Sequence, residues 1–150
     1  MTAKIESNFG REIMKNINAF WFRIENRHGG GVPDLYGIRD GVSIWLELKC
    51  FKQNSINITP TQISWNYNHF QENGKNYFLV KHTEQKTLKL YDGDKGRELK
   101  ESGFRVPCIV KIDFNQTFPL LGTSKKENYQ RAWKLLSDYL FSPPPLETRV

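Results

Sequence analysis

The sequence predicts an α/β fold, in which a small β-sheet has one helix packed before it and another between its strands. Apolar residues recur at helical spacing over residues 6–17. The dipeptide Asp40-Gly41, flanked by alternating apolar residues, predicts a β-hairpin over residues 33–51. Thr59-Pro60 then predicts the start of a second helix, because threonine is a good N-cap and proline suits the first helical position. Helices therefore alternate with strands along the chain.

Each element has its own local signal. In the first helix, Phe9, Ile13 and Ile17 share one face. Residues 19–25 are rich in aromatic side chains and predict a strand, which the glycines at 29–31 interrupt. The second helix stops at Asn73-Gly74, a C-cap signal. The remaining expectations are strands over 77–82 and 86–91, a turn at 92–94, an edge strand within 104–114, a helix over 126–141 and an extended proline tail at 143–145.

Length and composition favour a single domain with a nucleic-acid partner. The 150 residues suit one domain, with a core over about residues 3–115 and a C-terminal helix and tail over 124–150. The net charge of +6 suggests a polyanion such as nucleic acid, although the same charge could serve solubility alone. The two cysteines lack metal-binding spacing, and no apolar run could span a membrane or direct secretion, so a cytoplasmic location is expected.

The hairpin brings charged residues together. Counting outward from Asp40-Gly41 places Asp34 opposite Glu47, and Lys49 projects from the same face as Glu47. Like charges directly opposite each other are destabilising, so a divalent cation between the two carboxylates is the expected reason for the pair. The backbone carbonyl of Leu48 could supply a third oxygen. The alternative is an exposed cross-strand ion pair, which would contribute little.

These residues carry a family resemblance. Pro33-Asp34 followed by Glu47-Leu48-Lys49 resembles the signature of the PD-(D/E)xK nuclease superfamily. Glu6, on an amphipathic helix, resembles the first-helix acid of the VRR-NUC group and of archaeal-type Holliday-junction resolvases. The segment from Thr59 to Gln62 is similar to the helix start of VRR-NUC-like nucleases. The resemblance covers about residues 3–82.

The resemblance implies a restriction-endonuclease-like core, a central mixed β-sheet flanked by helices, which cuts DNA with Mg²⁺ or Mn²⁺. Asp34 and Glu47 would be metal ligands and Lys49 the catalytic lysine. Glu6 would be a further ligand or would hold water, with Glu12 as the rival for that role. Gln62 would be a polar contact in the active site, against the alternative of a solvent-facing helix residue.

The expected function is a structure-selective DNA endonuclease, similar to Holliday-junction resolvases and acting as a homodimer, because a four-way junction needs two coordinated cuts. The alternatives are a sequence-specific restriction-type nuclease and a non-catalytic DNA-binding protein that keeps a nuclease-like core. The residues expected to grip DNA phosphates are Arg23, Arg27, His28 and Lys52, each of which could instead be a solvated charge.

Overall fold

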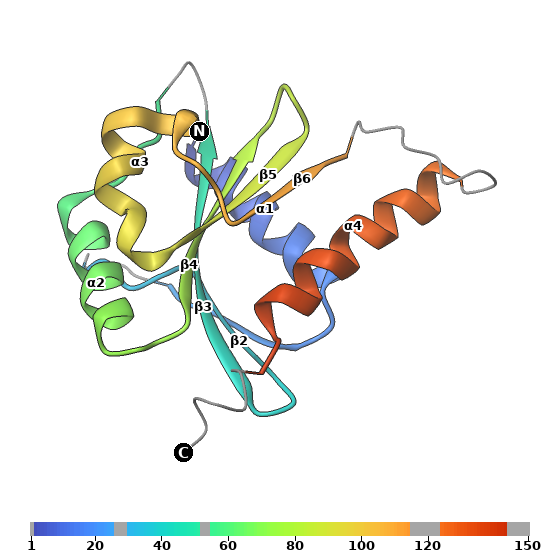
Figure 1. Cartoon of the computed structure of the whole chain (residues 1–150), viewed down its shortest axis with the longest axis horizontal. Helices are drawn as coiled ribbons and strands as arrows, with labels where there is room; N and C mark the ends of the chain where they lie inside the picture. Colours follow the sequence, from blue (N-terminus) through green and yellow to red (C-terminus); the bar gives the residue numbers. More distant parts are fainter. Residues whose placement is uncertain (1, 26–29, 52–54, 115–123, 144–150) are drawn as a thin grey trace.

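The protein is a six-stranded sheet with helices on both faces, seen in a computed structural model that describes residues 2–25, 30–51, 55–114 and 124–143 (Figure 1). The strands lie side by side in chain order, and β3 and β4 are the one parallel pair. The sheet is therefore mixed, and the expected α/β class is confirmed. Its strands are β1 (Phe20–Arg23), β2 (Leu35–Arg39), β3 (Val42–Phe51), β4 (Asn76–His82), β5 (Thr87–Asp92) and β6 (Val110–Asp113).

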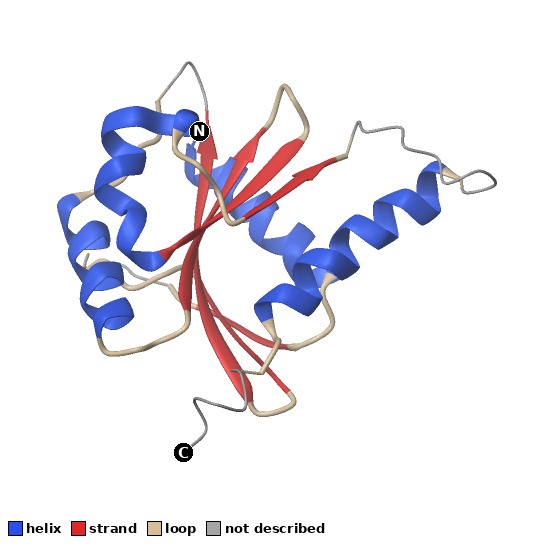
Figure 2. Cartoon of the chain, in the orientation of Figure 1, coloured by secondary structure: helices blue, strands red, loops and turns tan. Residues whose placement is uncertain are grey.

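The helices form two layers. Figure 2 shows the sheet between α2 and α3 on one side and α1 and α4 on the other. The parallel β3–β4 pair requires a crossover connection, which α2 supplies. The helices are α1 (Thr2–Asn16), α2 (Pro60–Gln71), α3 (Gly96–Ser102) and α4 (Lys125–Leu140), with short 3₁₀ turns η1 (Gly93–Lys95) and η2 (Gly103–Arg105) on either side of α3. This arrangement is the one expected of a restriction-endonuclease-like core.

Each face of the sheet has its own apolar core. Leu46 and Leu48 of β3 pack in the core that α1 and α4 cover. Phe78 and Val80 of β4 belong to the core on the opposite face, beneath α2 and α3. Successive side chains of a strand point to opposite faces. Glu47 and Lys49, which alternate with Leu46 and Leu48, therefore lie on the α2–α3 face.

The hairpin has the predicted register. Leu35 pairs with Leu46, and Arg39 pairs with Val42. Asp40 and Gly41 form the two-residue turn, and both have positive φ angles, 51° and 79°. This conformation matches the twist of the flanking strands and favours Asp-Gly. The prediction was wrong at the open end: the ladder stops at Leu35, and the chain bends at Asp34 instead of pairing that residue with Glu47.

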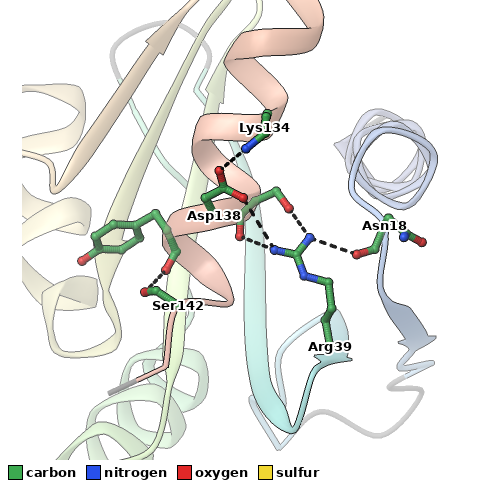
Figure 3. A network of polar contacts seen from close by, with 7 residues as sticks. Asn18, Arg39, Lys134, Asp138 and Ser142 are labelled. Atoms are coloured by element: carbon green, nitrogen blue, oxygen red, sulfur yellow. Dashed lines mark hydrogen bonds and ion pairs between the residues drawn. The ribbon is translucent and has the colours of Figure 1, made fainter. Parts of the chain in front are cut away.

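Arg39 attaches the closed end of the hairpin to α4. Its guanidinium donates to the Ser137 hydroxyl at 2.6 Å and to the Ser137 carbonyl at 3.3 Å (Figure 3). It also donates to the Asn18 carbonyl at 3.2 Å and lies 3.9 Å from an Asp138 carboxylate oxygen. Arg39 therefore joins three segments: the hairpin, the connection after α1, and the end of α4.

Two helices differ from the sequence analysis. Residues 92–94 were expected to form only a turn, yet the chain continues from η1 into α3, which packs Leu99 into the core. The helix α1 begins at Thr2 instead of residue 6. The other helices and strands lie where they were predicted, with ends shifted by a few residues, and β6 is at the sheet edge as expected. The expected proline tail lies outside the described residues beyond residue 143. Among the described helices, none combines the length and the apolar character needed to cross a membrane.

Candidate active site

Asp34 is held in place by the backbone around it. Its carboxylate accepts a hydrogen bond from the Leu48 amide at 2.8 Å, and its own carbonyl accepts from Ile24 at 2.9 Å. A continued ladder would place Pro33 opposite Leu48. The bend at Asp34 instead presents a side-chain oxygen to the Leu48 N–H. The Asp34 side chain thus takes the place of a ladder partner, which fixes it against β3.

Glu47 and Lys49 are buried together. The exposed fractions of the two residues are 1% and 5%, and Lys49 Nζ lies 3.6 Å from Glu47 Oε1. The second oxygen, Glu47 Oε2, is also buried and has no hydrogen-bond partner among the residues that the structure describes. A buried polar atom without a hydrogen-bond partner destabilises the folded state, so the unpartnered Glu47 oxygen requires an explanation. The alternative of an exposed surface ion pair is therefore wrong.

Glu6 belongs to the same electrostatic cluster. Its charge raises the pKa of Glu47, and its own pKa responds to Lys49 and Asp34. Glu12 is engaged elsewhere, since its carboxylate forms an ion pair with Lys81 at 2.8 Å. Because α1 begins at Thr2, Glu6 is not at the helix start, which was the reason for preferring it. The structure nevertheless supplies a different reason to prefer Glu6 over Glu12.

The three carboxyl groups hold protons more tightly than usual. Burial and the nearby Asp34 carboxylate together raise the pKa of Glu47 to about 9, against the opposing effect of Lys49. The pKa of Asp34 is raised by burial, against the opposing effects of the Leu48 amide and Lys49. Burial likewise raises the pKa of Glu6, which Lys49 opposes. The Glu47 carboxyl shares a hydrogen bond with that of Asp34, so without a cation the pair retains a proton.

The cluster offers oxygen ligands to a hard cation. The N–H and C=O groups of one residue in a strand point to the same side, so the Leu48 carbonyl faces Asp34 as the Leu48 amide does. The Leu48 carbonyl lies beyond Leu35–Leu46, the last pair between β2 and β3. Over the ranges that the structure describes, no three His, Cys, Asp or Glu side chains are arranged as metal ligands. Two carboxylates and a carbonyl instead suit Mg²⁺, which keeps several waters.

Gln62 has a different partner from the one expected. Its side-chain oxygen accepts from the Thr59 amide at 3.0 Å, and its own amide donates to the Thr59 hydroxyl at 3.3 Å. This reciprocal pair is a capping box, which satisfies donors at the start of α2. The contacts described for Gln62 do not include the carboxylates. The structure therefore assigns this side chain to the helix end.

The start of α2 nevertheless positions the site through Gly31. A Cβ atom at Gly31 would lie 2.1 Å from the Thr61 carbonyl oxygen, and the φ angle of Gly31 is +77°. Only glycine combines that conformation with such a close approach. The segment that leads into Asp34 is therefore packed directly against α2.

Of the predicted DNA-binding residues, Arg23 lies beside the cluster. It is the last residue of β1, where it pairs with Leu35, and its charge lowers the pKa of Asp34. Its guanidinium lies against Gly10 of α1. Arg27, His28 and Lys52 lie outside the described residues. Arg23 is thus close to the carboxylates. This is the position expected of a residue that contacts a phosphate beside them.

The sequence analysis assigned no role to a cavity close to Lys49. Phe51 and His82, which pair across β3 and β4, border it together with residues of α3 and η2. These side chains come from separate elements and follow no common spacing. No sequence motif could therefore have indicated the cavity.

Comparisons with known proteins find similar solved structures. No family model and no curated protein matches this chain. Among solved structures, the chain resembles the bacterial homing endonuclease I-Ssp6803I at 10% identity and a TM-score of 0.43, over 92% of this chain and 90% of that one. A likeness at that level says nothing about activity, which is inferred below from the geometry of the carboxylate cluster.

Proposed function

We propose that this protein is a metal-dependent DNA endonuclease that hydrolyses phosphodiester bonds. The observation that carries the proposal is the buried cluster of Asp34, Glu47 and Lys49, with Glu6 nearby and one carboxylate oxygen unpartnered. Burial of Glu47 beside the Asp34 and Glu6 carboxyl groups, which raise its pKa, is unfavourable unless a cation or a reaction makes use of them. The resemblance of the hairpin motif to PD-(D/E)xK nucleases supports the same assignment.

Mg²⁺ is the proposed cofactor, and Mn²⁺ is expected to substitute for it. Asp34 Oδ and Glu47 Oε2 would hold the ion, with the Leu48 carbonyl as a third ligand. When bound, the ion supplies charge neutralisation at the phosphate and activation of the attacking water. The orphaned Glu47 oxygen and the raised pKa values both fit this role, since a cation would compensate the charges that burial disfavours.

The other residues act on the reacting groups directly. The Lys49 ammonium, held beside Glu47, donates to the attacking water or to the phosphate oxygen that gains negative charge. Glu6 is placed to accept a hydrogen bond from that water. Arg23, next to Asp34, contacts the phosphate on the β1 side. The burial of Glu47 and Lys49 strengthens these interactions, because screening by water is weak there.

The proposed substrate is branched DNA, such as a four-way junction, cut by a homodimer. The net charge of +6 favours a polyanion. Phe20 and Phe22 on the edge strand β1 are 67% and 57% exposed. Such exposed aromatic residues on an edge strand suit contact with a second copy of the chain. Two copies related by a two-fold axis would provide the two cuts that a junction needs.

A cleavage assay tests the proposal. Purified protein is incubated with labelled four-way junction, flap, linear duplex and single-stranded DNA, with Mg²⁺ or with a chelator. We expect Mg²⁺-dependent cutting of branched substrates, and a loss on the order of a hundredfold or more in Lys49→Ala and Asp34→Asn. The exposed residue Glu84, in the β4–β5 turn, supplies the control Glu84→Gln, which should cut at the wild-type rate.

The possible outcomes separate the alternatives. Cutting at one defined site in long duplex would favour a restriction-type nuclease over a junction-selective one. If no substrate is cut although DNA binds, the chain is a non-catalytic DNA-binding protein. Undiminished cutting by Lys49→Ala would show that the cluster is not the active site.

A further inference from the structure

A cavity of about 510 Å³ opens on the same face of the sheet as Glu47 and Lys49. Its volume lies within the range of about 300–1,000 Å³ that is typical of ligand sites. The rings that line it are half-buried, and the polar side chains around them are exposed. The lining includes Phe51 of β3, His82 of β4, Glu101 and Ser102 of α3, and Phe104 and Arg105 of η2.

Three rings form an aromatic wall of this cavity. Phe51 and Phe104 are stacked, with ring centroids 5.2 Å apart and an interplanar angle of 29°. His82 contacts both, with its ring centroid 4.9 Å from that of Phe51 and 5.1 Å from that of Phe104. Lys89 holds the Phe104 ring in place: the Lys89 ammonium lies 3.9 Å from the Phe104 ring centroid and donates to the Phe104 carbonyl at 2.8 Å. The rings are therefore held in a set arrangement.

His82 also offers a directed hydrogen-bond donor. Its Nδ1 atom accepts a hydrogen bond from the Gln85 amide at 3.1 Å. In the neutral ring the proton therefore resides on Nε2, which becomes a donor. Together with the Ser102 hydroxyl and the Glu101 carboxylate, the wall combines ring faces with polar groups of both kinds.

The cavity lies close to the carboxylate cluster. Phe51 is two residues beyond Lys49 on β3, so the two side chains share a face and lie about 7 Å apart along the strand. His82 is the partner of Phe51 on β4. A strand of DNA whose phosphate reaches Lys49 would therefore carry its neighbouring nucleotide to this cavity.

We infer that the cavity receives one unstacked nucleobase of the DNA substrate, next to the scissile phosphate; this rests on the proposed nuclease function. A base has flat faces that stack on aromatic rings and a polar edge that pairs with donors and acceptors. Phe51, Phe104 and His82 supply the stacking surface, and Ser102 and Glu101 contact the polar edge. Arg105 pairs with the adjoining phosphate. The preferred substrate is thus DNA with an unpaired base at the cut, rather than fully paired duplex.

Binding without cutting tests this inference separately from the nuclease activity. Dissociation constants are measured by fluorescence anisotropy in a chelator, for a short single-stranded oligonucleotide and for the matching duplex. The variants are Phe51→Leu and Phe104→Leu, which keep an apolar side chain but lose the ring, and Phe104→Tyr, which keeps it. Tyr67→Leu is the control, because Tyr67 is 49% exposed on α2 and lies outside the cavity lining.

We expect each leucine variant to weaken single-strand binding about fivefold or more, and Phe104→Tyr to stay within about twofold of wild type. Duplex binding and single-strand binding by the Tyr67→Leu control should not change. Equal affinities for wild type and both leucine variants would overturn the inference, as would equal weakening for single strand and duplex. Free deoxynucleotide that binds the wild type but does not compete with the strand would also overturn it.

The thermal melting of each variant is measured first. If Phe104→Leu does not fold, the test uses Phe51→Leu, on β3, and Arg105→Gln, at an exposed position. If the wild type binds single strands in this manner but never cuts DNA with Mg²⁺, the proposed nuclease function is refuted and the inference about the base-binding cavity stands. If the wild type cuts DNA and the leucine variants bind and cut equally well, the inference about the cavity is refuted and the proposed nuclease function stands.

Discussion

The Asp34 carboxylate accepts a hydrogen bond from the Leu48 amide at 2.8 Å, across the open end of the hairpin. In this contact a side-chain oxygen of Asp34 takes the place of a backbone partner for β3. It also brings the Asp34 carboxylate close to Glu47 and Lys49, the two residues that flank Leu48. Four predictions concern how this arrangement is maintained, and one concerns the cation.

Without a divalent cation, stability should fall as pH rises. In the folded protein burial raises the pKa of Glu47 from its ordinary value of 4.5 to about 9, and the pKa values of Asp34 and Glu6 are raised as well. The folded state therefore binds more protons than the unfolded state, and the stabilisation present below about pH 5 is lost progressively towards about pH 9. Thermal melting in a chelator across this range measures the effect. Glu47→Gln should give a shallower profile, whereas a wild-type profile that rises with pH would contradict the assignment.

Mg²⁺ should stabilise the protein in proportion to its occupancy. A ligand that binds only the folded state at ten times its dissociation constant adds about 1.4 kcal/mol. The melting temperature of wild type at about pH 8, where the carboxyl groups release protons more readily, should therefore rise by a few degrees on addition of Mg²⁺. Asp34→Asn and Glu47→Gln should lose this shift and Glu84→Gln should keep it. A shift of equal size in all four proteins would place the cation elsewhere.

Gly31→Ala should destabilise the protein and slow cutting. The added Cβ would lie 2.1 Å from the Thr61 carbonyl oxygen, so the segment before Asp34 must move away from α2. Gly30→Ala is the matched control: Gly30 also has a positive φ, +97°, but nothing lies within 4 Å of an added Cβ. Both variants should lose about 1 kcal/mol from backbone strain, and Gly31→Ala at least about 1 kcal/mol more. Chemical denaturation compares them, and equal losses would show that the close approach is unimportant.

Inserting one residue between Asp40 and Gly41 should abolish metal-dependent cutting while DNA binding persists. A shift of one residue in register moves every β2 side chain to the other face and carries Asp34 away from the Leu48 amide. The control is Asp40→Asn, because asparagine tolerates the positive φ of 51° at this position without changing the loop length. Cleavage and anisotropy assays on the same preparations report the two activities. An insertion variant that cuts normally would show that the turn does not set the site.

Arg39→Ala should lower the free energy of unfolding by about 1–3 kcal/mol, because it leaves the partly buried Ser137 groups without their charged donor. Lys134→Ala is the control. Lys134 also pairs with Asp138, at 2.7 Å, but its side chain is 74% exposed, so the change should be below about 0.5 kcal/mol. Urea denaturation measures both variants. Comparable losses would mean that Arg39 contributes no more than an ordinary surface charge.

Local chemistry made the hairpin predictable. A two-residue loop at Asp40-Gly41 allows one register, so the strand pairs followed from counting alone. The burial of Glu47 and Lys49 could not be predicted in this way. Strand alternation shows which face of the sheet a side chain occupies, but not which elements cover that face. Similarly, α3 is a seven-residue helix, too short for its apolar spacing to show a period.

The candidate site was predictable where its residues are neighbours in sequence. Asp34, Glu47 and Lys49 lie on one hairpin, so a local rule brings them together. The preference for Glu6 rested on a helix start that proved to be at Thr2, and its proximity to the cluster depends on how α1 packs on the sheet. The motif predicted an active-site contact for Gln62, but the Gln62 side chain forms part of the capping box. Long-range packing decided both cases.

The segment from η1 to η2 has a consequence for how this fold could diversify. The carboxylates and the lysine all come from residues 6–49, whereas one wall of the neighbouring cavity is built by residues 101–105, at the end of α3 and in η2, between two later strands. The proposed chemistry and the proposed recognition are thus encoded in separate stretches of the gene. Related chains could exchange the stretch between β5 and β6 and acquire new substrates while inheriting the same reaction.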